Sequence, residues 1–364
     1  MYGHRFLRRS PWLTASIALT MLLLLVLPGT VLAQSQSGGG SYQKINLVSD
    51  LPGVAKFTDP NLVNPWGISF SSSSPFWISD NGTSVSTLYD GHGKAIPLVV
   101  TIPPPAGGTV ALPTGTVFNN FPNAFVVSAN GMSGQAFFLF DTLSGTISGW
   151  NPNVDGTHAI LAVDNSKAGA VYTGLTIGSN HGHPLLFAAN FAAGTIDAFD
   201  AKFAPAKLQG SFHDPGIPKG YAPFNIQSIG SQLYVTYARQ DRMAGQGRGF
   251  VDIFDTNGNL VKRLISHSAL NLPWGVTLAP ADFGQFSNDL LVGNFGNGWI
   301  NAFDPHTGAF LGSLTDRHGN PFAINRLWAL AFGNGGQAGK TNQLFFTAGI
   351  HNEQHGLFGF IEAV

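Results

Sequence analysis

The segment His351–His355, with the sequence His-Asn-Glu-Gln-His, carries the residues of this chain best suited to chemistry. It contains two imidazoles and one of only two glutamates in the chain. In an extended loop, alternate side chains point to the same side. His351, Glu353 and His355 would then offer a ligand set for a divalent metal such as zinc, copper or iron. The competing interpretation is a solvated polar hairpin, because no helix fixes the spacing.

Neutral polar and aromatic side chains form a second set of candidates. The polar members, near the expected ends of strands, are Asn64, Asp80, Asn130, Asn190, Asn225, Asn294 and Arg326, and the aromatic members are Trp66, Trp274 and Trp328. Amides and aromatic rings on one concave surface would suit a carbohydrate or an aromatic small molecule. The alternatives are that the asparagines cap turns and that the tryptophans pack between structural units.

An internal repeat predicts the elements that position these residues. Pro-Trp-Gly occurs at 65–67 and 273–275, and degenerate copies bring the number of openings to six, about 50 residues apart. The openings are Trp66, Thr114, Thr173, Phe224, Trp274 and Trp328. Gly67, Gly115, Gly174, Asn225, Gly275 and Ala329 follow them. These mostly small residues indicate six inner strands that converge on one axis, where backbones approach closely.

The rest of each repeat predicts a β-sheet. Second strands are expected at 76–79, 124–128, 185–188, 232–236, 289–292 and 343–347. Third strands end at an aspartate that can cap the following turn, at Asp90, Asp141, Asp200, Asp255 and Asp304. The sixth repeat lacks an outer strand, which residues 42–48 can supply. We therefore expect an all-β, six-bladed β-propeller of four-stranded antiparallel blades, closed by the N-terminal strand.

Three phrases of the sequence resemble a known group of proteins. Gly249–Asp255, Asn294-Phe295-Gly296 and Leu327–Gly336 are similar to NHL/YVTN-type β-propellers. More narrowly, they resemble a family of exported bacterial propellers, whose members often carry a PEP-CTERM sorting tail. The resemblance covers about residues 43–364. The tail is absent here, so sorting by that route is not expected. The resemblance implies the fold and brings no particular activity with it.

The N-terminal segment predicts export. Residues 1–33 combine early arginines, an apolar run and a small-residue cleavage pattern, which is typical of a signal peptide. The alternative is an uncleaved anchor, which would be the only contact with a membrane. A flexible Gly/Ser linker at 34–41 and a single propeller domain at 42–364 follow. The protein is expected to be secreted, periplasmic or on the cell surface, and the absence of cysteine excludes disulfides.

Composition and motifs together favour a binding function. Charged residues make up 10% of the chain and its net charge is −1, so nothing favours nucleic acid as a partner. We expect a monomeric ligand-binding or interaction scaffold, with its site at the channel mouth near blades 5, 6 and 1. Carbohydrates, aromatic small molecules and envelope proteins are the candidate partners. The alternative is a metal-dependent hydrolase, lactonase or oxidoreductase that uses the histidine cluster, and the sequence leaves open whether the protein is an enzyme.

Overall fold

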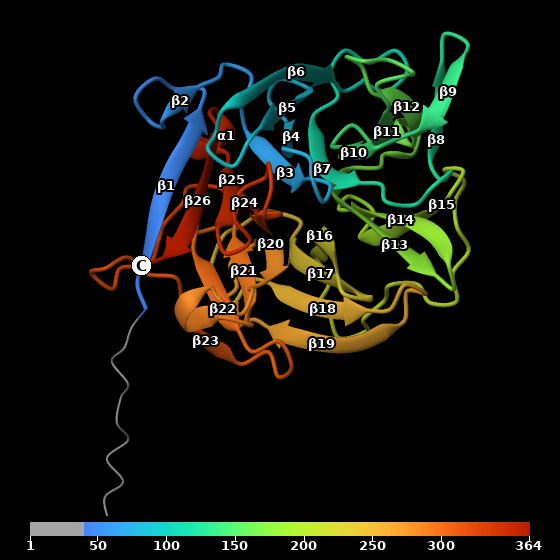
Figure 1. Cartoon of the computed structure of the whole chain (residues 1–364). Coiled ribbons are helices and arrows are strands. Elements are labelled where there is room, and N and C mark those ends of the chain that lie inside the picture. Colours follow the sequence, from blue (N-terminus) through green and yellow to red (C-terminus); the bar gives the residue numbers. More distant parts are fainter. Residues whose placement is uncertain (1–39) are drawn as a thin grey trace, which may run out of the picture. The chain divides into compact units, whose positions relative to one another are not determined.

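The computed structural model describes residues 40–364, and these form a ring of six antiparallel sheets (Figure 1). The inner strands are β3 (Pro65–Ser69), β7 (Pro113–Phe118), β13 (Tyr172–Asn180), β16 (Tyr221–Ile229), β20 (Pro273–Leu278) and β24 (Leu327–Phe332). They contact one another in this order, and β24 contacts β3. The predicted six-bladed β-propeller is confirmed. The signal peptide predicted at 1–33 and most of the linker predicted at 34–41 lie outside the described residues.

Further strands continue each blade outward from the axis. Blade 1 adds β4 (Phe76–Asp80), β5 (Val85–Tyr89) and β6 (Ala95–Thr101), and blade 2 adds β10 (Phe138–Thr142), β11 (Thr146–Trp150) and β12 (Ile160–Asp164). Blade 3 adds β14 (His183–Asn190) and β15 (Thr195–Asp200), with its fourth strand reduced to a bridge between Phe199 and Pro205. Blade 4 adds β17 (Gln232–Arg239), β18 (Phe250–Phe254) and β19 (Leu260–Ser266), and blade 5 adds β21 (Leu290–Asn294), β22 (Ile300–Phe303) and β23 (Phe310–Ser313).

The N-terminal strand completes blade 6, as the sequence predicts. Blade 6 continues from β24 through β25 (Leu344–Ala348) and β26 (Leu357–Ala363) to β1 (Tyr42–Ser49), and β2 (Phe57–Thr58) lies parallel to β1. β1 and β26 pair antiparallel, from Tyr42 opposite Ala363 to Ser49 opposite Leu357. The Tyr42 hydroxyl also donates to the carbonyl of Phe283 in blade 5 at 3.0 Å. The ring is therefore closed by hydrogen bonds between the two ends of the folded domain.

The opening motif has the same local geometry in every blade. Pairing between the inner and second strands is interrupted at each opening, as between Pro65 and Ile68 in blade 1. A Cβ on Gly115 would lie 2.3 Å from the Leu175 amide nitrogen of the next blade, and one on Gly275 would lie 2.5 Å from the Trp328 carbonyl oxygen. At these glycines the neighbouring inner strands are therefore too close for a side chain. This confirms the expectation drawn from the small residues.

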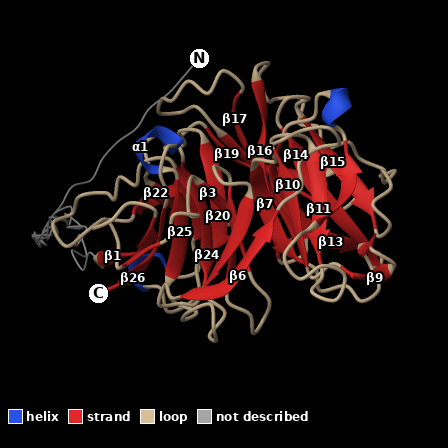
Figure 2. Ribbon diagram, turned by 90° about the horizontal axis from the view of Figure 1, so that it is seen from above, coloured by secondary structure: helices blue, strands red, loops and turns tan. Residues whose placement is uncertain are grey.

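Blade 2 departs from the prediction. Residues 124–128 do not form its second strand; instead they lead into a separate hairpin of β8 (Val126–Ala129) and β9 (Met132–Gln135) at the periphery of the ring (Figures 1 and 2). The inner strand β7 pairs directly with β10. Asp141 consequently ends a second strand and not a third. The prediction was wrong because an inserted hairpin with one buried face has the same hydrophobic pattern as a blade strand.

The hydrophobic core is divided among the spaces between blades. Six clusters lie between adjacent blades around the ring, for example Trp77 of blade 1 against Phe138 and Trp150 of blade 2. A seventh cluster lies at the axis. Within residues 40–364, no helix is both long and apolar enough to cross a bilayer.

Candidate functional site

The three predicted tryptophans close one end of the central channel. Trp66 and Trp328 are stacked with ring centroids 3.4 Å apart, and Trp274 lies edge-on to both. Phe224 of blade 4 lies 6.5 Å from Trp66 of blade 1, and these blades are on opposite sides of the ring. Phe295 completes the cluster, 4.3 Å from Trp328. All five rings are buried. They form an aromatic plug across the face on which the inner strands begin, which we call the start face.

Most of the predicted asparagines hold this plug and its loops in place. The Asn64 side-chain oxygen accepts a hydrogen bond from the Trp328 indole nitrogen at 3.0 Å, which joins blade 6 to blade 1. The Asn225 amide donates to the Trp274 carbonyl at 2.9 Å. Asn294 donates to the Ala269 carbonyl, and Asn190 donates to Asp197. These four amides are buried and engaged within the protein.

Two further candidates do not face the channel mouth: one is buried inside its blade and the other lies on the β8–β9 hairpin. Asp80 is fully buried in blade 1 and accepts hydrogen bonds from the backbone and hydroxyl of Thr87. Burial raises the pKa of Asp80 well above its ordinary value. Asn130 lies exposed at the tip of the β8–β9 hairpin. Its expected place at the mouth is wrong, because this hairpin lies outside the ladder of blade 2.

The predicted metal ligands share one turn but take different partners. The loop is not extended: His351, Asn352 and Glu353 have φ values of 53°, 58° and 71°, in the short turn α1 (Ile350–Glu353). His355 Nδ1 lies 2.6 Å from Asp50 Oδ2, and the two histidine rings are 5.4 Å apart. Among the described residues, no three His, Cys, Asp or Glu side chains gather as metal ligands. This geometry does not bring the three predicted ligands together, and the metal centre stays a prediction.

A pair of arginines lies on the start face above the plug. The guanidinium carbons of Arg242 and Arg326 lie 5.0 and 4.7 Å from the centroid of the Phe295 ring. Arg242 donates to Glu353 Oε1 at 2.7 Å, and Arg326 donates to Asn352 Oδ1 at 3.3 Å. Arg326 and Glu353 were candidates from the sequence. Arg242 was not, and its only sequence signal is the glycine-rich loop that contains it.

The channel is open at the other end. A cavity of about 380 Å³, which we call the end cavity, is lined by residues of all six inner strands and of the segments that follow some of them. Hydroxyl and amide groups in its lining come from Ser69, Thr116, Asn120, Thr176, Gln227 and Thr277. The rings of Phe70, Phe118 and Phe332 also line it. None of the described residues in the lining is charged.

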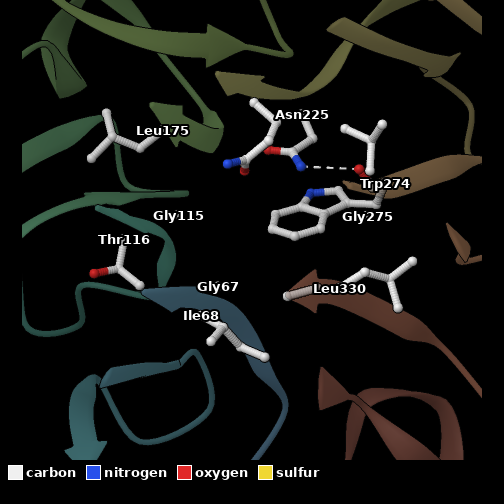
Figure 3. Close-up of a pocket in the computed structure, with 12 residues that line it drawn as sticks. Gly67, Ile68, Gly115, Thr116, Leu175, Asn225, Trp274, Gly275 and Leu330 are labelled. Carbon is white, nitrogen blue, oxygen red and sulfur yellow. Dashed lines mark hydrogen bonds between the residues drawn. The ribbon is translucent and has the colours of Figure 1, made fainter. Parts of the chain in front are cut away.

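The channel narrows between the end cavity and the plug. A space of about 20 Å³ there is lined by Gly67, Gly115, Gly275, Asn225 and Trp274 among others (Figure 3). That volume accommodates about one water molecule. The Asn225–Trp274 hydrogen bond, drawn as a dashed line in Figure 3, fixes the plug over this space. The channel is therefore blind: it is closed at the start face and open at the opposite face.

Comparison with known proteins gives a family and confirms the fold. The chain is 34% identical over 331 residues to "Uncharacterized protein R648" of Acanthamoeba polyphaga mimivirus, a match that covers 87% of this chain and 80% of the viral protein. The chain belongs to the family of this mimivirus protein. No protein-family model matches the sequence. The narrower resemblance to exported bacterial propellers therefore stays a prediction.

Solved structures resemble this chain in fold alone. Virginiamycin B lyase from Staphylococcus aureus is 11% identical, with a TM-score of 0.51 over 89% of this chain and 99% of that one. The soluble aldose sugar dehydrogenase from Escherichia coli is 10% identical, with a TM-score of 0.51 over 89% of this chain and 100% of that one.

Proposed function

We propose that this protein is an exported binding propeller that holds a neutral, hydroxyl-rich small molecule, such as a sugar, in the end cavity. The observation that carries the proposal is the blind channel, because the aromatic plug leaves a single open end with a cavity of about 380 Å³. Cavities of this size are typical of small-molecule sites.

The chemistry of the end cavity supports a ligand with many hydroxyl groups. Each inner strand lies at one end of its sheet, so its edge toward the axis has backbone N–H and C=O groups without a strand partner. The side-chain amide of Gln227 is exposed and makes no hydrogen bond within residues 40–364. Phe70, Phe118 and Phe332 can pack against the apolar faces of a sugar ring. An ionic ligand would meet no opposite charge in this lining.

The proposal is for binding without catalysis. The described residues of the lining include no side chain that titrates near neutral pH, so general acid–base chemistry has no donor or acceptor of protons there. The fold by itself does not decide function, since propellers of different activities share it.

Calorimetric titration with D-glucose and myo-inositol tests the proposal. Thr277→Trp should fill the end cavity and abolish binding, and Gln227→Leu should weaken it about tenfold, the effect of one lost hydrogen bond. Leu311→Trp is the matched control, because Leu311 is exposed on the outer strand β23, and it should bind like the wild type. Unchanged binding by Thr277→Trp, or no binding of either probe to the wild type, would refute the proposal.

Export is part of the same proposal. It is supported by the predicted signal peptide and by the resemblance to exported propellers. When the full chain is expressed in a Gram-negative host, mass spectrometry of the periplasmic protein should show a mature N-terminus at Gln34. Full-length protein confined to the cytosol, with residues 1–33 retained, would contradict export.

A further inference from the structure

We infer that the arginine pair on the start face is a second binding site, separate from the end cavity, which takes the carboxylate of an acidic small molecule. Glu353 occupies this site when the ligand is absent. The inference does not depend on the proposed function, because the aromatic plug separates the two sites.

Three blades build the site. Arg242 comes from the loop after β17 in blade 4, Phe295 follows β21 in blade 5, and Arg326 and Glu353 flank β24 and β25 in blade 6. Phe295 is 1% exposed and packs against Trp328. It is therefore a fixed surface on which both guanidinium groups lie, as arginine commonly does on aromatic rings.

The balance of charge at the site is positive. Arg242 and Glu353 compensate each other, while Arg326 has only the neutral Asn352 amide as a side-chain partner within residues 40–364, and its Nε is buried without a hydrogen bond there. The other charged groups nearby are engaged elsewhere. Arg239 pairs with Asp241, Asp50 pairs with His355, and Arg248 donates to the carbonyls of Met243 and Ala244.

Glu353 indicates the chemistry of the ligand. Its carboxylate reaches across from blade 6 to Arg242 in blade 4 at 2.7 Å, so the structure already places a carboxylate beside the arginine pair. Both partners are partly exposed, at 42% and 26% for their side chains. Exposed ion pairs stabilise a protein little, so an external carboxylate can replace this one at small cost. Two guanidinium groups offer a carboxylate the paired N–H donors that it binds best.

The backbone at the site is held in an unfavourable conformation. Arg242 has φ of 52°, and His351, Asn352 and Glu353 follow one another in the left-handed region. The positive φ of Arg326 recurs at the equivalent Asn64, Leu112 and Leu272, so it belongs to the repeat. Non-glycine residues in this region cost of order 1 kcal/mol each and tend to gather at functional sites.

Titration with sodium succinate at constant ionic strength tests the inference, with succinamide as the neutral control. Glu353→Gln should tighten succinate binding about tenfold, because it removes the competing carboxylate. Arg242→Gln and Arg326→Gln should each weaken it about tenfold. Arg239→Gln, on the same loop but paired with Asp241, is the matched control and should bind like the wild type.

Additional variants distinguish carboxylate binding at the arginine pair from binding in the end cavity and from simple charge attraction. Thr277→Trp, which fills the end cavity, should leave succinate binding unchanged, and far-UV circular dichroism should show each variant folded. Arg326→Lys keeps the charge but loses the paired donors, and should bind succinate more weakly than the wild type. The inference is overturned if Glu353→Gln does not change the affinity, if Arg242→Gln binds as the wild type does, or if inorganic phosphate binds more tightly than succinate.

Discussion

Asp252 in blade 4 is a carboxyl group held out of water beside a second carboxylate, that of Asp214. It is fully buried on β18, no donor among the described residues reaches its oxygens, and its own proton can be shared with Asp214. Burial raises the pKa of Asp252 to about 8; the nearby Asp214 carboxylate adds to the increase and Arg263 opposes it. Asp214 itself is paired with Arg263, whose Nε donates to Asp214 Oδ2 at 2.6 Å. Asp252 is therefore protonated at neutral pH.

This protonation makes stability depend on pH. Between its unfolded value of 3.8 and about 8, the unfolded state loses the Asp252 proton while the folded state keeps it. The free energy of unfolding should therefore fall as pH rises across this window, by about 1.4 kcal/mol per pH unit for this group, and level off above pH 8. Below pH 4 the Asp252 carboxyl group is protonated in both states, and its full contribution to the free energy of unfolding is present.

The variant Asp252→Asn tests this dependence. The amide is uncharged at every pH, so the variant should lose the contribution and become more stable relative to the wild type as pH rises from 5 to 8. Urea unfolding of both proteins at several pH values gives the difference between their free energies of unfolding. The raised pKa values of buried Asp80 and Asp141 affect both proteins equally, so they cancel in this difference. Parallel pH profiles for the two proteins would show that Asp252 is ionised in the folded state.

Residue types could be predicted from the sequence more reliably than residue partners. Trp66 and Trp328 were placed correctly at equivalent openings, but ring closure decides that they stack on each other. His351, Glu353 and His355 were assigned to one side of an extended loop, and the left-handed turn separates their partners. Partners depend on contacts across blades, which no local spacing encodes.

At the scale of elements, β1 stabilises the domain both by burial of its side chains and by closure of the ring. Its side chains Tyr42, Leu47 and Val48 are buried, and burial of each contributes about 1.5–3 kcal/mol. Deletion of residues 42–49 removes these contacts and leaves β26 as an exposed edge. The loss is comparable with the whole stability of a typical domain. The deleted protein should aggregate or remain unfolded.

Size-exclusion chromatography with light scattering and a thermal melt would measure this effect. Lys44→Thr is the control, because Lys44 lies on the same strand with an exposed side chain, and it should give a monomer that melts within a few degrees of the wild type. A monodisperse deletion variant with the melting temperature of the wild type would contradict the role assigned to β1.

Elements were predictable wherever the repeat was regular. The second strands of five blades were located by analogy with one another, and four of the five hydrophobic-Asp motifs cap turns, as Asp90 does for the amides of His92 and Lys94. Asp141 differs: its carboxylate accepts from the Thr114 hydroxyl at 2.7 Å. The inserted β8–β9 hairpin shifts that motif by one strand. A repeat alignment without gaps cannot detect such an insertion.

At the scale of the whole molecule, the two faces of the ring differ in character. The start face is closed by aromatic rings and bears charged groups, whereas the opposite face opens into a neutral cavity. The sequence predicted the ring and its inner strands, and it placed the candidate site on the start face, where the aromatic rings close the channel. Which end is open depends on how side chains from opposite blades meet at the axis. That arrangement emerges only when all six blades are assembled.

The pairing of β1 with β26 also determines when the ring can form during synthesis. The first strand of the domain can pair with the short β2, but it lacks its antiparallel partner until the last strand, Leu357–Ala363, has been made. Until then, blade 6 is incomplete and its edge is open to proteases and to other chains. Contacts between such distant segments also slow folding. A nascent chain must therefore be kept from aggregating until β26 emerges, and a chain truncated before β26 cannot close its ring in this way.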